Sequence, residues 1–125
     1  MPETIVVFSS VPDETKGREI ARALVEARLA ACAKVSAPCA SFYWWEGKLA
    51  EDREFILTIV TKASLFGELE TKLKALHPYA VPEIIALPVT ADSRDYLEWV
   101  EKETSSQLER PGRSKPIQTG KTPPD

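Results

Sequence analysis

The chain has 125 residues, which fits one small domain. Its 43% of hydrophobic residues can build a core, and its formal net charge of −3 argues against nucleic-acid or anionic-membrane partners, which favour a basic face. No segment approaches the ~20 apolar residues of a membrane span, and the start MPETIVVFSS has no basic signal-peptide region. We therefore expect a cytoplasmic protein without nucleic-acid or membrane partners.

The first predicted elements are a buried strand and a helix. The β-branched apolar run TIVVFSS, residues 4–10, is typical of a buried strand. Pro12 and Asp13 suit a helix start. Apolar residues then recur at helical spacing and predict a helix that continues to about residue 31, namely at Ile20, Leu24, Ala27 and Ala31.

Residues 32–61 predict two strands joined by a tight turn. The first strand spans about 32–45, and Pro38 within it marks a bulge or an edge position. Glu46-Gly47-Lys48 has the composition of a turn, and the second strand is the β-prone run 53–61. The strands are long enough for this hairpin to project beyond the domain.

The second half predicts a helix, a strand and a final helix. In residues 64–77, Ser64 is a plausible cap, and leucines form an apolar stripe that ends before Pro78. Residues 81–90 predict a strand, and residues 93–103 predict a short helix. After residue 104 the chain becomes polar and rich in proline, so we predict a domain over 1–104 and a tail over 105–125.

This order of elements, βαββαβ followed by a helix, predicts an α+β ferredoxin-like sandwich. Two right-handed βαβ units form a four-stranded antiparallel sheet with both helices on one face. The other face of the sheet would carry apolar side chains, and a partner would have to cover it.

The motifs LAACAKV (29–35), YWWEGK (43–48), HPYAVPEIIALPV (77–89) and DYLEWV (95–100) resemble the CutA family of divalent-cation tolerance proteins. The resemblance extends over about residues 4–103. It implies a PII-like homotrimer that is not an enzyme and takes part in tolerance of divalent metal ions. It also implies no obligatory cofactor, with Cu(II) as a bound cation in some members. Where such members have a cysteine and a histidine pair, this chain has Ser9 and Leu76-His77.

His77 is the only histidine and the main candidate for a metal ligand. It would need partners, for which Cys32, Cys39 and Glu83 are available, although their spacing matches no metal signature. Copper is the expected ion because it heads the divalent affinity order. The alternative for His77 is a residue that ends a helix before Pro78, and for Cys32 a small buried core residue, because a nucleophile would need a nearby base. Cys32 and Cys39 lie roughly 20 Å apart along one expected strand, beyond disulfide reach.

A second candidate is a polar pocket, which in a trimer would fall between subunits. Carboxylates and a lysine could line it together with Tyr79 and Lys62, namely Glu46, Lys48, Glu54 and Glu83. The alternative is that Glu46 and Lys48 are solvated turn residues and that Glu83 only flanks Pro82 at the start of a strand.

Aromatic residues around the turn predict a subunit interface, formed by Tyr43, Trp44, Trp45, Tyr79 and Pro82. Adjacent strand residues face opposite sides, so one tryptophan should point to the domain's own core and the other away from it. The alternatives to an interface are packing on the chain's own core and stacking on a ligand.

Other functions of this fold fit less well. A PII-type ligand-binding trimer, with sites in the clefts between subunits, is the main alternative, but it would carry a long loop where this chain has a tight turn. An acylphosphatase-like enzyme would need a phosphate cradle, where SSVPDET offers a proline and two acids. An RNA-binding sheet would need more aromatic residues than Phe55 on its central strand.

Overall fold

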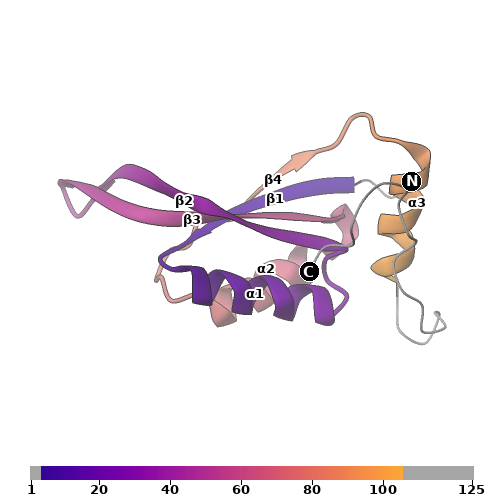
Figure 1. The fold of residues 1–125 in the computed structure, drawn as a ribbon, viewed down its shortest axis with the longest axis horizontal. Coiled ribbons are helices and arrows are strands. Elements are labelled where there is room, and N and C mark those ends of the chain that lie inside the picture. The colour runs from indigo at the N-terminus through magenta and orange to yellow at the C-terminus, as the bar shows by residue number, and fades with distance from the viewer. Residues whose placement is uncertain (1–3, 106–125) are drawn as a thin grey trace.

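The computed structural model describes residues 4–105, so the predicted tail lies outside the described residues except for Ser105. The elements in chain order are β1 (Thr4–Val11), α1 (Glu14–Glu26), β2 (Cys32–Trp45), β3 (Lys48–Lys62), a 3-10 turn (Ala63–Leu65), α2 (Phe66–Leu76), β4 (Ile85–Pro88) and α3 (Arg94–Glu103). The sheet has the order β2-β3-β1-β4 with antiparallel pairing throughout. Figure 1 shows α1 and α2 on one face and α3 at the end opposite the hairpin tip. The ferredoxin-like prediction, with its additional C-terminal helix, is confirmed.

Three predicted boundaries are wrong. Helix α1 ends at Glu26 rather than near residue 31, because Arg28 adopts a left-handed φ of 64° that turns the chain. Ser64 does not cap α2, which begins after the 3-10 turn and has no side-chain cap. The strand expected over 81–90 covers only Ile85–Pro88.

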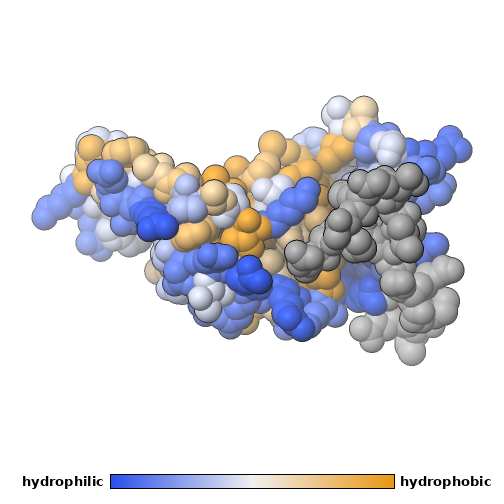
Figure 2. All heavy atoms as spheres, viewed as in Figure 1, coloured by the Kyte–Doolittle hydropathy of each residue, from blue (hydrophilic) through white to orange (hydrophobic). Residues whose placement is uncertain are grey.

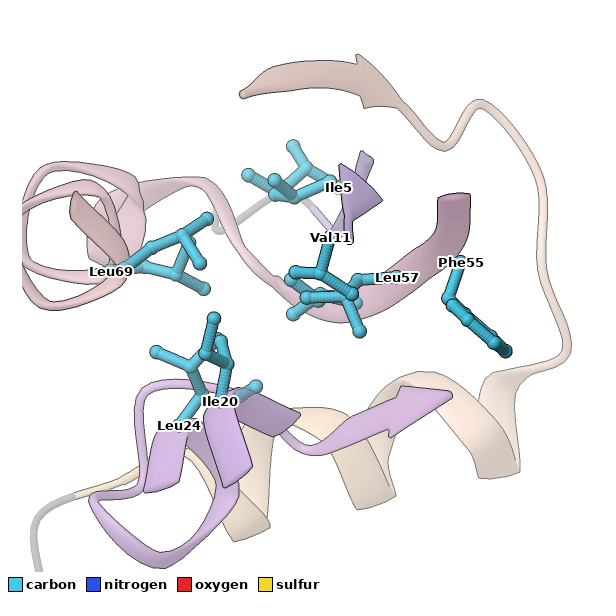
Figure 3. Packing of buried hydrophobic residues seen from close by; sticks show 11 residues of the cluster. Ile5, Val11, Ile20, Leu24, Phe55, Leu57 and Leu69 are labelled. Carbon is cyan, nitrogen blue, oxygen red and sulfur yellow. The ribbon is translucent and has the colours of Figure 1, made fainter. Parts of the chain in front are cut away.

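The core lies between the sheet and the two helices. Figure 3 shows Val11 and Leu57 of the sheet facing Ile20, Leu24 and Leu69 of the helices. Gly17 is buried, and a methyl group added there would come within 3.1 Å of Val11 and 3.2 Å of Val35. This glycine therefore weakens the helix intrinsically but lets α1 approach the sheet closely.

The hairpin extends beyond the domain, as predicted. Strand β1 pairs with β3 only along Phe55–Lys62, so residues 38–54 form an arm that projects past the helices (Figure 1). At its tip, Glu46 and Gly47 have φ values of 50° and 78°, the left-handed pair of a two-residue hairpin turn. At its base, the pairing shifts by one residue between Val35 and Pro38, which confirms the predicted bulge. The hydroxyl of Ser36 accepts a hydrogen bond from the Ile56 N–H there, at 2.9 Å.

Candidate functional site: the open sheet face and the base of the arm

The sheet face opposite α1 and α2, called the open face below, carries a row of apolar side chains. Because directly paired residues share a face, the register aligns Val6 with Val60 and Leu87, and Phe8 with Ile85. Ile85 is 51% exposed and Leu87 53%. Figure 2 shows apolar atoms gathered on the side away from α1 and α2, over the arm and β4. Patches of this kind mark interaction surfaces.

The bulge at the base of the arm decides which way each tryptophan points. One extra residue in β2 reverses the alternation of its side chains, since Val35 pairs with Leu57 and Pro38 with Phe55. Beyond the bulge, Tyr43 and Trp45 therefore lie on the open-face side of the arm, and Trp44 on the other. Trp44 is 74% and Trp45 50% exposed. The expectation that one tryptophan packs on the chain's own core is wrong, because the arm has left the core behind.

A polar cluster, formed by Tyr43, Asp52, Glu54 and Tyr79, lies where the arm joins the domain. Asp52 and Glu54 are two residues apart on β3 and so share the open-face side. The Tyr79 hydroxyl donates to Glu54 at 2.7 Å, and the Tyr43 hydroxyl donates to Asp52. Burial, followed by the hydrogen bond to Glu54, raises the pKa of Tyr79. The hydrogen bond to Asp52 raises the pKa of Tyr43. Both phenols thus stay protonated donors to a pair of carboxylates.

The predicted polar pocket is therefore only partly assembled. Tyr79 and Glu54 meet, but Lys62 pairs with Glu101 of α3 at the opposite end of the sheet, at 3.4 Å. Sequence reasoning missed Asp52, and it placed Tyr43 in the subunit interface but not in this polar cluster. The two-residue spacing of Asp52 and Glu54 on a strand was the available signal.

His77 is 8% exposed, and both of its ring nitrogens are engaged. Its Nε2 lies 2.7 Å from the carbonyl oxygen of Ser10, which can only accept, so Nε2 carries the proton. Its Nδ1 accepts the N–H of Tyr79 at 3.1 Å. The ring lies 4.8 Å from that of Tyr79 between centroids. In this arrangement His77 positions the segment that carries Tyr79 and has no free lone pair for a metal ion.

The predicted metal ligands are not gathered in one subunit. Cys32 pairs with Val60, which pairs with Val6, whereas His77 binds Ser10. Four residues of β1, roughly 13 Å, separate those two points. Glu83 lies exposed in the segment before β4. Among residues 4–105, no three His, Cys, Asp or Glu side chains come together to hold an ion, so the donor set of one subunit does not fit a bound metal.

Ser9 lies on the helix side of β1 and is 1% exposed. Within the described part of the chain its hydroxyl has no hydrogen-bond partner. It adds an unsatisfied polar atom to the core rather than a ligand to the open face.

The family described as CutA1 divalent ion tolerance protein matches residues 5–103. The chain belongs to the CutA1 family. The divalent-cation tolerance protein CutA of Thermus thermophilus is 46% identical over 99 residues, which are 79% of this chain and 96% of that protein. Human Protein CutA is 44% identical over 79% of this chain and 55% of its own length. The crystal structure of CutA1 from Oryza sativa superposes with a TM-score of 0.81 at 40% identity, over 86% of this chain and 97% of that one.

No helix among residues 4–105 of this CutA1-family chain has the length and apolarity to span a bilayer.

Proposed function

We propose that this chain forms a homotrimer that takes part in tolerance of divalent cations. The observation that carries the proposal is the uncovered apolar open face, which continues along the arm to Tyr43 and Trp45. The role in tolerance is inferred from membership of the CutA1 family, since the Thermus relative is named for divalent-cation tolerance.

The shape of the subunit supports a closed ring. The arm projects away from the domain, so its open-face side cannot fold back onto its own sheet. Contact between the arm of one subunit and the open face of the next is head-to-tail, and such contacts close into rings when the rotation allows. Three subunits is the number that the family resemblance implies.

The five predicted interface residues fit this arrangement unequally. Tyr43 and Trp45 lie on the arm side that continues the open face, and Tyr79 is half-buried beside it. Pro82 is half-buried in the segment that leads into β4. Trp44 faces the opposite way and would contact a neighbour only if that neighbour also reached the helix side of the arm.

We propose that tolerance does not depend on an ion held by one subunit, because His77, Cys32 and Glu83 lie apart and both His77 nitrogens are engaged. Cu(II) is the cation to test first, since it heads the divalent affinity order. We also propose that the protein is not an enzyme, because its single histidine has no free nitrogen to act as a base. Two free cysteines fit the reducing cytoplasm, the compartment we propose.

A PII-type switch receives less support. The β2–β3 connection is the two-residue turn Glu46-Gly47, and ligands have no long loop there to reorder.

Growth of cells that lack the gene tests the proposed function. Expressing this chain should restore growth in raised Cu(II), and a Trp45→Ala chain of equal abundance should restore it less. Full rescue by a chain shown to be monomeric would contradict the trimer as the functional form. No rescue by the unaltered chain with Cu(II), Zn(II) or Co(II) would contradict the tolerance role.

A further inference from the structure

The charged side chains on the open face and on the arm side that continues it include three residues, namely Lys34, Asp52 and Glu54. Lys34 projects from the edge strand β2, where it pairs with Thr58, which pairs in turn with Phe8. Asp52 and Glu54 lie at the base of the arm, opposite Ser41 and Cys39. Glu54 is 7% exposed, whereas Lys34 and Asp52 are exposed.

These charges do not pair with one another within the described part of one subunit. Thr58, the partner of Lys34, lies four residues from Glu54 along β3, or roughly 13 Å. In residues 4–105, none of the three takes part in an ion pair.

Other cations near the face are already paired, point to the helix side or lie at the tip of the arm. Lys62 pairs with Glu101. The Arg53 guanidinium lies over the ring of Phe55, 5.8 Å from its centroid, on the helix side of the arm. Lys48 is at the exposed tip, opposite Trp45. Away from the tip of the arm, Lys34 is therefore the one cation on this side of the sheet for which the described residues provide no ion pair.

If a neighbouring subunit covers this face, its unpaired charges lose contact with water, which costs free energy. A charge removed from water without a partner loses several kcal/mol, and a well-placed opposite charge offsets that loss. If the arm of one copy lies across the sheet of the next, as proposed above, two carboxylates of the arm are carried onto the face that bears a lone lysine.

We propose that Lys34 of each subunit pairs with the Asp52–Glu54 carboxylates of its neighbour. The contact offsets one of the two carboxylate charges at the interface and fixes where the arm lies along the neighbouring sheet. This inference depends on the proposed trimer. The Tyr43 and Tyr79 hydroxyls position the carboxylates by donating to them, which leaves the remaining carboxylate oxygens for the lysine.

A double-mutant cycle on trimer dissociation tests the pairing. One variant is Lys34→Met, which removes the charge and keeps an unbranched side chain only one atom shorter. The other is Asp52→Asn with Glu54→Gln, in which the amide oxygens still accept from the tyrosines. Dissociation is followed by light scattering in urea, which does not screen charges. Circular dichroism confirms that each variant is folded.

Each variant alone should raise the trimer's dissociation constant at least tenfold, and the combined variant should raise it no further. Lys72→Met on α2 and Glu51→Gln on the other side of the arm are matched controls, both exposed, and should change it less than twofold. A trimer whose two variants act additively, or not at all, overturns the pairing alone. An unaltered chain that is monomeric overturns the proposed trimer as well.

Discussion

Replacing Trp45 with alanine should loosen the proposed trimer far more than replacing Trp44. Trp45 lies on the arm side that continues the open face and is 50% exposed in the subunit. If a neighbour covers the exposed half of its roughly 250 Å² side chain, about 125 Å² leaves water. At about 25 cal/mol per Å², that contact contributes about 3 kcal/mol per subunit.

Three copies of the contact sum to at most about 9 kcal/mol, on the order of a millionfold in the trimer's dissociation constant. Trp44 is more exposed, at 74%, but it lies on the helix side of the arm, which does not continue the open face. Its replacement should therefore change the constant less than tenfold. Analytical ultracentrifugation over a dilution series measures both effects. Dissociation by Trp44→Ala with Trp45→Ala unaffected would refute the assignment of faces that rests on the bulge at Pro38.

Three further predictions concern the subunit and are checked by urea unfolding. Ser9→Ala should stabilise it by about 1 kcal/mol, because it removes an unsatisfied buried hydroxyl; a loss of stability would show that the hydroxyl has a partner. Glu103→Ala should cost about 2 kcal/mol, because it breaks the 2.9 Å pair that joins the end of α3 to Arg28; an unchanged midpoint would contradict this. The pKa of Tyr79 is raised in the folded state, so the neutral phenol stabilises the fold. This contribution to the free energy of unfolding is complete below the unfolded pKa of ~10 and is lost as pH rises through the higher folded value. Tyr79→Phe should therefore flatten the stability loss above about pH 10, and an equally steep loss would be inconsistent with the shift.

Much of the fold was predictable because each element has a strong local signal. Alternation, the Glu46-Gly47 turn and the break at Pro38 predicted the hairpin, its projection and its bulge. The end of α1 was not predictable in this way, because the apolar residues after Arg28 continue the helical spacing although they lie outside the helix. Ala30 and Ala31 are buried in the connection to β2. The strand expected over 81–90 is cut short because only Ile85–Pro88 pair in register with β1, and beyond them the Val89 N–H adds one hydrogen bond to the Thr4 carbonyl.

The candidate site was less predictable because its contacts join distant segments. The bond between Tyr79 and Glu54 spans 25 positions, and that between His77 and Ser10 spans 67. The sequence identified both His77 and Tyr79 but could not show that His77 uses both nitrogens to hold the backbone. It also could not tell Trp44 from Trp45, because a single inserted residue in the bulge reverses their directions.

The mass of the full chain in solution tests the central claim most directly. Static light scattering at micromolar concentration should give three times the 13.9 kDa of one chain, unchanged on tenfold dilution. A mass of 13.9 kDa would contradict the account, because the open face and the arm would then be exposed to water in the functional protein.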